Sequence, residues 1–336
     1  MNVAQIVESL RASRGFGHKT DIAGVLASLG SALPGGVRDL GQAVAVGDDC
    51  AAIADHDGYL LFAIEGMVSD FIHARPWFAG YSAVMVNVSD IYAMGGRPLA
   101  VVDAIWSAGV AEAAEVLKGM AAASAAYGVP IVGGHSNARS DHGQLAVAIV
   151  GRARSLLSSF AARLGDRLLM AVDLRGAFAE PYPYWNASTG APAGRLRADL
   201  ELLPVLAEDG LCAAAKDISM AGTLGTALML LECSGVGARI DLHRIPAPAD
   251  VPLPRWLTAF PSYGFLLAVR EQDAERVSER FRARDIACAE IGVIDDSRQV
   301  SVSGAGETAL LWDFARDAFI VPRAGCPARD ATPIDA

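Results

Sequence analysis

Residues 82–98 constrain the fold most, because they place two polar side chains inside an apolar helical run. The run, Ser-Ala-Val-Met-Val-Asn-Val-Ser-Asp-Ile-Tyr-Ala-Met-Gly-Gly-Arg-Pro, is mostly apolar up to the pair Gly95-Gly96, where a helix is expected to end. Asn87 and Asp90 are three positions apart, so they lie on one face of the predicted helix. A buried carboxylate is costly unless a cation or several hydrogen-bond donors meet it. The sequence therefore predicts a partner for Asp90.

Length and composition indicate an ordinary packed protein. A chain of 336 residues accommodates either two domains of about 150 residues or one large domain. Hydrophobic residues make up 52% of the chain and charged residues 20%, so no window is typical of disorder. The formal net charge of −10 disfavours nucleic acid and anionic membranes as partners. A local metal ion and a few cationic side chains would still suffice to hold a nucleotide.

The cysteines and the N-terminus indicate the cellular compartment. The chain has five scattered cysteines and no Cys-x-x-Cys pair, which argues against a disulfide framework and a thiolate zinc site. The first residues lack the basic start and apolar core of a signal peptide, and no apolar run approaches the roughly 20 residues that span a bilayer. We therefore expect a cytoplasmic protein without membrane contact.

The order of predicted elements favours an α+β fold over a single doubly wound sheet, because strands and helices are mixed without strict alternation. The pattern restarts after residue 153, which predicts an N-terminal domain (1–153), a C-terminal domain (154–320) and a tail (321–336). Helices are predicted over 3–12, 20–29, from 76 to the glycine pair, and over 111–127, 199–207, 223–233 and 272–284. Strands are predicted over 44–46, 50–54, 59–68, 99–106, 130–133, 144–152, 166–174, 213–217, 236–242, 264–269, 286–294 and 299–302.

Three connecting segments carry candidate binding residues or resist assignment. Residues 14–19, Arg-Gly-Phe-Gly-His-Lys, predict a mobile connector whose Lys19 either reaches a phosphate or stays a solvated surface residue. Residues 133–136, Gly-Gly-His-Ser, follow a predicted strand and form either an oxyanion site of backbone N–H groups or a tight turn. Residues 175–198 are rich in Gly, Pro, Tyr and Ala and are expected to form a loop or lid.

Five acidic residues lie within or at the ends of apolar elements rather than on polar surfaces. Hard cations such as Mg²⁺ take oxygen ligands and leave positions for phosphate and water, so this set suits a metal–polyphosphate site. Each residue also has a structural alternative: a turn, an edge strand facing solvent, a hydrogen bond inside a helix, or an N-cap. The residues are Asp48, Asp49, Glu65, Asp90 and Asp217. The set as a whole is a stronger signal than any member.

Familiar nucleotide and hydrolase motifs do not occur in the sequence. There is no Gly-x-x-x-x-Gly-Lys-Ser/Thr loop and no complete dinucleotide fingerprint. A Gly-x-Ser-x-Gly elbow and a His-Glu-x-x-His pair are also missing, which argues against an α/β-hydrolase and a zinc protease. Any nucleotide must therefore be held by another architecture.

Several motifs together resemble the superfamily of aminoimidazole ribonucleotide (AIR) synthase, thiamine-monophosphate kinase, selenophosphate synthetase and the hydrogenase maturation protein that dehydrates a carbamoyl group. Residues 47–52, Gly-Asp-Asp-Cys-Ala-Ala, look like a segment of thiamine-monophosphate kinase. Residues 87–98 and 133–136 are similar to the helix motif and the Gly-Gly-His segment of selenophosphate synthetase. Residues 216–222, Lys-Asp-Ile-Ser-Met-Ala-Gly, resemble the start of the second-domain helix throughout the group. The matches run in family order from about residue 15 to residue 245.

The resemblance implies a two-domain AIR-synthase-like fold. Its N-terminal domain would bind ATP and Mg²⁺ and would pair with a second copy into a shared dimeric β-barrel, and its C-terminal domain would be an α/β sandwich. Carried over by position, the metal or metal-water ligands would be Asp48, Asp49, Glu65, Asp90 and Asp217. The residues near the phosphates would be Lys19, Asn87, Gly133, Gly134 and His135, with Lys19 and Asp49 as catalytic residues.

The chain departs from the named members of the group at three positions. Selenophosphate synthetase has a Cys or selenocysteine in its Gly-x-Gly-x-Lys-like loop, whereas the loop here, with His18, has no thiol, which argues against that activity. Glu65 and His135 stand where thiamine-monophosphate kinase usually has Asp, which puts that kinase activity in doubt. The sequence is therefore nearest to the AIR synthase-related members, whose acceptors it does not reveal.

The sequence thus predicts an ATP- and Mg²⁺-dependent phosphotransferase or ligase that activates a small-molecule oxygen or phosphate acceptor. Two alternatives stay open: thiamine-monophosphate kinase, and a nucleotide-binding regulatory protein that has lost catalysis. A metabolite-binding protein without a nucleotide is a third reading. The expected partners are the acceptor and a second copy of the chain.

Overall fold

The computed structural model describes residues 2–32 and 46–321, and the chain clusters into two compact units. Unit 1 comprises residues 1–48, 158–187 and 211–336, and unit 2 comprises residues 49–157 and 188–210. The expected boundaries, 1–153 and 154–320, differ from these units in two places. The first 48 residues cluster with the second half of the chain, and residues 188–210 cluster with the first half. Each unit is described by itself.

Unit 2 is built on an open five-stranded sheet with the order β1-β2-β5-β3-β4. All neighbouring strands are antiparallel except β3 and β4, which run parallel. The bounds are β1 Ala51–Asp55, β2 Gly58–Met67, β3 Arg97–Trp106, β4 Ile131–Asn137 and β5 Gln144–Ala153. No closed barrel is present among the residues that the structure describes. The shared barrel therefore remains a prediction that needs a second chain.

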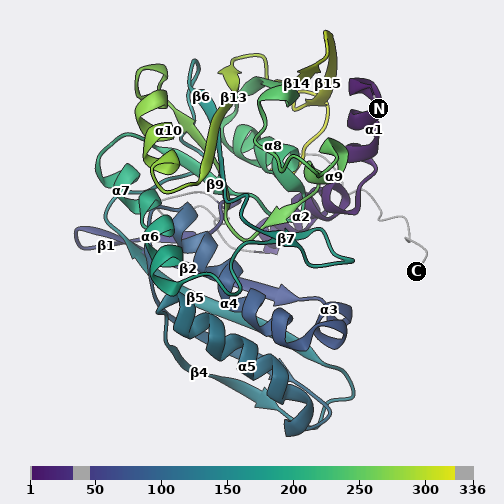
Figure 1. Ribbon diagram of the computed structural model, residues 1–336, viewed down its shortest axis with the longest axis vertical. Coiled ribbons are helices and arrows are strands. Elements are labelled where there is room, and N and C mark those ends of the chain that lie inside the picture. The colour runs from purple at the N-terminus through teal and green to yellow at the C-terminus, as the bar shows by residue number, and fades with distance from the viewer. Residues whose placement is uncertain (1, 33–45, 322–336) are drawn as a thin grey trace. The chain divides into compact units, whose positions relative to one another are not determined.

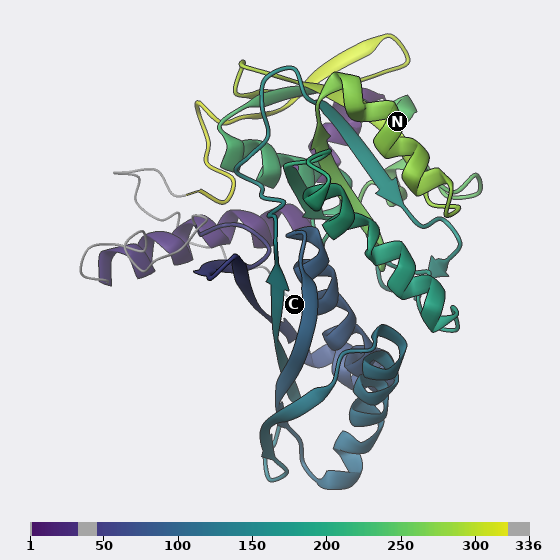
Figure 2. The ribbon, with the colours of Figure 1, turned by 90° about the vertical axis from the view of Figure 1, so that its left-hand side faces the viewer.

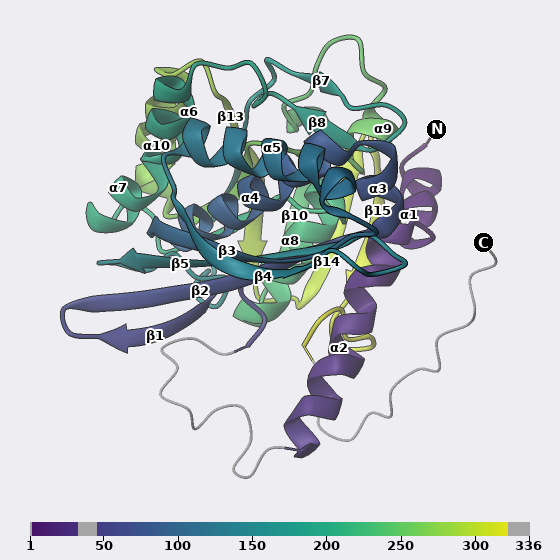
Figure 3. The ribbon, with the colours of Figure 1, turned by 90° about the horizontal axis from the view of Figure 1, so that it is seen from below.

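Helices cover one face of the five-stranded sheet (Figure 3). Helix α4 (Pro76–Ala93) begins with Pro at a favourable first-turn position, and its chain then reaches Gly95, whose φ of +75° only glycine adopts without strain. Fourteen residues of α4 are buried, because the sheet lies on one side of this helix and helix α5 (Val110–Tyr127) on the other. The short helix α3 (Ser69–Ala74) also contacts α4. The predicted buried helix is confirmed.

Polar contacts attach residues 188–210 to unit 2. The Ser188 hydroxyl lies 2.7 Å from the Tyr81 hydroxyl and 2.6 Å from the Tyr127 hydroxyl. Arg97 on β3 donates to Glu201 at 2.8 Å and to Glu208 at 2.6 Å. Glu201 immediately precedes helix α7 (Leu202–Glu208), which follows α6 (Ala193–Leu200), and Glu208 is the last residue of α7. Long-range hydrogen bonds of this kind cannot be read from the local sequence.

Unit 1 is built on a seven-stranded sheet with the order β15-β14-β10-β13-β6-β12-β9. The strands are β6 Arg167–Val172, β9 Ala214–Asp217, β10 Gly237–Asp241, β12 Gly264–Val269, β13 Ala287–Asp295, β14 Gln299–Gly304 and β15 Glu307–Asp313. Helix α8 (Gly222–Ser234) is buried from Gly222 to Leu231 and contributes much of the core. Helix α1 (Val3–Arg11) contacts β15, and helix α10 (Ala274–Arg282) contacts β13 and β6.

A second, small sheet of unit 1 has the order β11-β8-β7, and its strand β7 is labelled in Figure 1. Its strands are β7 Ala177–Phe178, β8 Tyr184–Asn186 and β11 Phe260–Pro261, and helix α9 (Leu253–Trp256) precedes β11. The two 3₁₀ turns are η2 (Leu242–Arg244) and η3 (Glu271–Asp273). The segment 175–198 therefore contains β7, β8 and most of α6 rather than a structureless loop.

Two predicted connections are wrong. Residues 14–19 do not form a mobile connector, because helix α2 extends over Arg14–Ala32 (Figure 2) and includes both glycines. Residues 133–136 do not follow a strand, because β4 continues through them. The sequence also missed α3 and β15, and the predicted strand 44–46 lies largely outside the described residues. The helices that the structure describes include none long and apolar enough to cross a membrane, and the cytoplasmic location remains a prediction.

Reciprocal glycines bring α4 and α5 into close contact. A Cβ on Gly80 would lie 2.0 Å from the Val116 carbonyl oxygen, and one on Gly119 would lie 1.9 Å from the Trp77 carbonyl oxygen. Neither distance is compatible with a methyl group, so the two helix backbones would have to separate. This packing excludes water from the side of α4 that faces away from the sheet.

We predict that Gly119→Ala lowers the free energy of unfolding by roughly 1–3 kcal/mol, the usual range for overpacking. Gly17→Ala is the control, because a Cβ at Gly17 meets nothing within 4 Å and alanine favours helix α2. Urea unfolding followed by circular dichroism measures both variants. Equal stability of Gly119→Ala and the wild type would contradict the packing argument.

Candidate metal and nucleotide site

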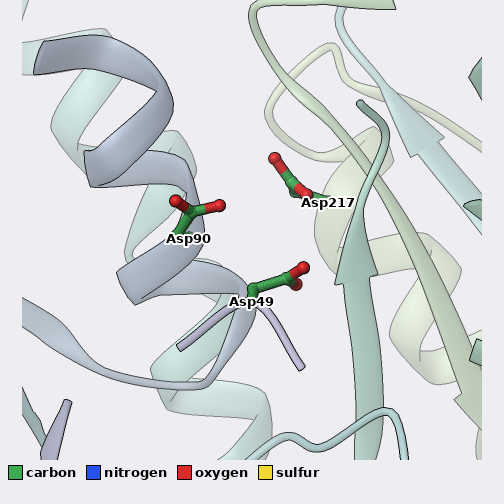
Figure 4. A group of neighbouring side chains, drawn as sticks. All are labelled: Asp49, Asp90 and Asp217. Atoms are coloured by element: carbon green, nitrogen blue, oxygen red, sulfur yellow. The ribbon is translucent and has the colours of Figure 1, made fainter. Parts of the chain in front are cut away.

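Asp49 and Asp90 bring two carboxylates together within unit 2 (Figure 4). One oxygen of each lies within 4.8 Å of the other. Asp90 projects from α4 and is 6% exposed, whereas Asp49 lies in the turn that precedes β1 and is half-buried. Two carboxylates at this separation repel each other unless a proton or a cation lies between them. Oxygen donors of this kind suit Mg²⁺.

Asn87 adds an oxygen to the same helix face. Its side chain is 0% exposed, and its Nδ2 donates to the Ala83 carbonyl at 2.8 Å. Its Oδ1 is buried and has no hydrogen-bond partner among the described residues. An unsatisfied buried acceptor costs about 1–3 kcal/mol, so it indicates a donor or cation that binds there. Asn87 precedes Asp90 by three residues and therefore lies on the same side of α4.

Asp48 has a different environment from its neighbour Asp49. Its Oδ2 accepts hydrogen bonds from the Ser158 hydroxyl at 2.8 Å and the Ser159 backbone N–H at 2.9 Å, and its Oδ1 accepts one from the Ser159 hydroxyl at 2.6 Å. These contacts all lie in unit 1. They favour a structural role, and the predicted metal contact of Asp48 stays a prediction.

Asp217 ends strand β9 in unit 1 and is 5% exposed. It pairs with Phe265 of β12 in the sheet register, and the Ile218 N–H donates to the Gly264 carbonyl at 2.8 Å. Two residues further on, the Ser219 hydroxyl oxygen is buried and lacks a hydrogen-bond partner within the described residues. The role of Asp217 as a metal ligand stays a prediction.

The positions of Lys19 and Glu65 do not test their predicted roles. Lys19 is half-buried in helix α2, not on a flexible connector. Glu65 is exposed on β2 and is not part of the carboxylate group found among the described residues. Their predicted contacts with phosphate and metal remain predictions.

Gly133, Gly134 and His135 lie on the edge strand β4, in which every residue is exposed. A Cβ on Gly134 would lie 2.5 Å from both the carbonyl oxygen and Oδ1 of Asp103 on β3, so this position requires glycine. His135 contacts the Trp106 ring with centroids 5.8 Å apart. The strand thus exposes backbone groups along its free edge, although it is not the turn that the sequence predicted.

Asp103 is a candidate that the sequence analysis missed. Burial raises the pKa of its carboxyl group, and a hydrogen bond from its own backbone opposes that rise. The carboxylate lies against Gly134, one of the predicted phosphate-binding residues. A signal was available, because Asp103 is the single charged residue inside the predicted strand 99–106.

Comparison with protein families identifies the chain. Residues 47–153 match the model described as AIR synthase related protein, N-terminal domain, and residues 188–304 match the corresponding C-terminal domain. The Synechocystis protein "Uncharacterized protein sll0787" is 49% identical over 278 residues, which cover 82% of this chain and 86% of the relative. The chain belongs to the AIR synthase-related family. The resemblance inferred from the motifs is therefore confirmed.

Solved structures agree on the fold of this AIR synthase-related protein. PurL of T. maritima complexed with ATP has a TM-score of 0.68 at 18% identity, covering 85% of this chain and 48% of PurL. AaThiL complexed with AMPPCP and TMP has a TM-score of 0.61 at 20% identity, covering 78% of this chain and 89% of AaThiL. The chain thus spans about half the length of PurL. At these identities the likeness shows the two-domain α+β fold alone.

We predict that Asp48→Ala lowers the free energy of unfolding by about 1–3 kcal/mol, because it leaves the Ser158 and Ser159 donors without their acceptor. Asp49→Asn should leave the stability of the metal-free protein unchanged or raise it, because it removes one of two neighbouring negative charges. Urea unfolding in the presence of a chelator measures both. A larger loss in Asp49→Asn than in Asp48→Ala would contradict this division of roles.

Proposed function

We propose that this protein is an ATP- and Mg²⁺-dependent enzyme of the phosphotransferase or ligase class that activates a small-molecule oxygen or phosphate acceptor. The observation that carries the proposal is the pair Asp49–Asp90, which has carboxylate oxygens within 4.8 Å of each other, with the unsatisfied Oδ1 of Asn87 on the same helix as Asp90. Family membership supports it, because PurL has been solved with ATP and AaThiL with AMPPCP. Both carry the fold found here.

The donor set fits Mg²⁺ better than a softer metal. Carboxylate oxygens dominate it, no described cysteine joins the group, and one to three carboxylates leave positions for phosphate oxygens and water. We assign Asp49 and Asp90 as the principal ligands, and the metal contact of Asp217 stays a prediction from the family resemblance. When bound, the metal would neutralise the polyphosphate and the negative charge of the transition state.

Nearby polar groups supply the remaining contacts of the proposed site. Asn87 Oδ1 would accept a hydrogen bond from metal-bound water, and Lys19 would contact a phosphate. The exposed edge of β4, with Gly133, Gly134 and His135, would offer backbone N–H groups to phosphate oxygens. Asp103 lies against this edge, and burial raises the pKa of its carboxyl group above the usual range of an aspartate.

A nucleotide-binding regulator without catalysis is the second candidate. The observation that favours it is the exposed position of Glu65 together with His135 in place of an acidic residue, since both reduce the number of carboxylates available to metal. Turnover separates the two candidates. An ATP-binding protein that forms no ADP above background with thiamine monophosphate or other phosphorylated acceptors would be a regulator.

We predict that Asp49→Asn and Asp90→Asn each weaken Mg²⁺-dependent binding of AMPPCP by tenfold or more, because each removes a charged ligand, and a lost charge-assisted contact costs about 1.5–3 kcal/mol. Asp70→Asn is the control, because Asp70 is an exposed carboxylate in helix α3 of the same unit. Isothermal titration calorimetry with and without Mg²⁺ measures the affinities. Wild-type affinity in both folded variants would refute the proposed metal site.

The open face of the five-stranded sheet supports a homodimer. Helices cover the face of Leu61 and Ala63, whereas Phe62 and Ile64 on the other face of β2 are 51% and 65% exposed. Ile53 of β1 and Val102 of β3 share this open face through the strand register and are 45% and 41% exposed. An apolar face of this kind marks an interaction site. We propose that a second copy covers it, so that two such sheets form the shared barrel.

We predict that Ile64→Glu converts the dimer into a monomer, because a charge buried against an apolar face lacks a partner. Val110→Glu is the control, because Val110 is 75% exposed at the start of α5, away from the sheet face. Analytical ultracentrifugation at micromolar concentration measures the change. Equal dissociation in both variants would place the interface elsewhere.

A further inference from the structure

The small sheet of unit 1 carries aromatic side chains on both faces. Because successive strand residues point to opposite sides, Trp185 lies on one face of β8 and Tyr184 on the other. Phe178 pairs with Trp185 in the register, and Phe260 pairs with Tyr184. Each face therefore has its own aromatic group.

The inner face of this small sheet is buried in the core of unit 1. Trp185 and Trp256 are 5% and 1% exposed, with ring centroids 5.2 Å apart at 88°. The Trp185 indole N–H donates to the Asp173 carbonyl, and that of Trp256 donates to the Pro246 carbonyl. Edge-to-face packing with satisfied donors is the ordinary arrangement of a core. This face fixes β7 and β8 in place.

The outer face has a different geometry. Tyr182 and Tyr184 stack with centroids 5.3 Å apart and ring planes only 7° from parallel, and Phe260 meets Tyr184 edge-on at 6.0 Å. Both tyrosines are half-buried, so part of the stack remains exposed to solvent. A parallel, partly exposed pair supported from the side presents a flat apolar surface with polar edges.

A cation accompanies this aromatic surface. Burial and the neighbouring Tyr182 raise the pKa of Tyr184, whereas the guanidinium of Arg14 lowers it. Arg14 is exposed at the start of α2, and its Nε contacts His18 Nε2 at 3.3 Å. It makes no ion pair among the described residues, so its charge is available to an anion.

The chain path links the aromatic surface to Asp217 within unit 1. Strand β11 leads through two residues to β12, and there Phe265 pairs with Asp217. The start of α2 also lies against the segment after Asp217, because a Cβ on Gly15 would be 2.3 Å from the Met220 carbonyl oxygen. The unsatisfied Ser219 hydroxyl lies in that same segment. Aromatic surface, cation and Asp217 thus belong to one end of one unit.

We propose that Tyr182 and Tyr184 form the acceptor site, which takes a planar aromatic or heteroaromatic ring bearing an anionic group that pairs with Arg14. The term acceptor rests on the function proposed above, whereas the binding site itself does not. Stacking accounts for the parallel tyrosines, because any flat π-system continues such a stack. The exposed guanidinium accounts for the anion, because Arg pairs with phosphate or carboxylate through two parallel hydrogen bonds.

The test compares phenyl phosphate with cyclohexyl phosphate, which match in charge and size but differ in the flat ring. Binding to the full chain is measured by saturation-transfer NMR and calorimetry, for the wild type and four variants. Tyr184→Leu removes the flat surface and Tyr184→Phe keeps it. Arg14→Gln removes the cation, and Arg276→Gln is the control, because Arg276 is exposed on helix α10 with no ion pair among the described residues.

Phenyl phosphate should bind the wild type about tenfold more tightly than cyclohexyl phosphate, and Tyr184→Leu should abolish this preference. Tyr184→Phe and Arg276→Gln should bind as the wild type does, whereas Arg14→Gln should weaken both phosphates. Equal affinity for the two phosphates, or a preference that survives in Tyr184→Leu, would overturn the proposal.

AMPPCP titrations of the same variants separate this inference from the proposed function. Weaker AMPPCP binding in Tyr184→Leu would show that the stack holds the nucleotide base and would also overturn the proposal. If AMPPCP fails to bind the wild type while the aromatic preference holds, the ATP-dependent function fails and the aromatic site stands. If AMPPCP binds with Mg²⁺ and the preference is absent, the function stands and the acceptor site fails.

Discussion

The cost of burying a carboxylate in helix α4 determines how unit 2 is built. Asp90 is 6% exposed on a helix that has a sheet on one side and α5 on the other, so water is largely excluded from its surroundings. That exclusion depends on Gly80 and Gly119, which let the two helices approach closely. Asp49 lies in a separate turn, and its negative charge is close to that of Asp90. Close packing keeps the two carboxylates out of water, whereas their mutual repulsion disfavours this arrangement. A bound divalent cation would offset the repulsion.

Asp48 and Asp49 are adjacent in one turn but have different surroundings. Asp48 is saturated by donors from Ser158 and Ser159, so its carboxylate ties residues at the two boundaries of unit 1 together. Asp49, the next residue, begins unit 2 and belongs to the carboxylate pair. A Gly-Asp-Asp sequence predicts two acidic groups but gives no information on their partners, because these are more than 40 residues away in the chain. Only the tertiary structure distinguishes Asp48, which is hydrogen-bonded to serines, from Asp49, which belongs to the carboxylate pair.

Elements with a strong local pattern were predicted from the sequence, and elements determined by distant contacts were not. The apolar run of α4 and its terminal glycines gave the correct helix and the correct shared face of Asn87 and Asp90. Residues 14–19 were predicted as a connector because two glycines weaken a helix, yet Gly15 fits closely against Met220 and the helix forms. Residues 133–136 were predicted to follow a strand, as an oxyanion site or a tight turn, whereas Gly134 is required by its approach to Asp103 within a strand. Glycine marks close approach as well as flexibility, and the sequence alone does not distinguish the two.

The two units can be assigned different parts of one reaction. Unit 2 supplies the carboxylates of α4 and of the preceding turn, which suit a metal and a polyphosphate whatever the acceptor is. Unit 1 supplies residues 175–187 and β11, where local sequence was least informative and where the aromatic side chains gather. Asp217 lies in the same unit as those aromatic side chains, at the end of β9, which pairs with β12. The inner face of the small sheet is fixed by the packing of Trp185 against Trp256, so only its outer face, with the stacked Tyr182 and Tyr184, is partly accessible to a ligand.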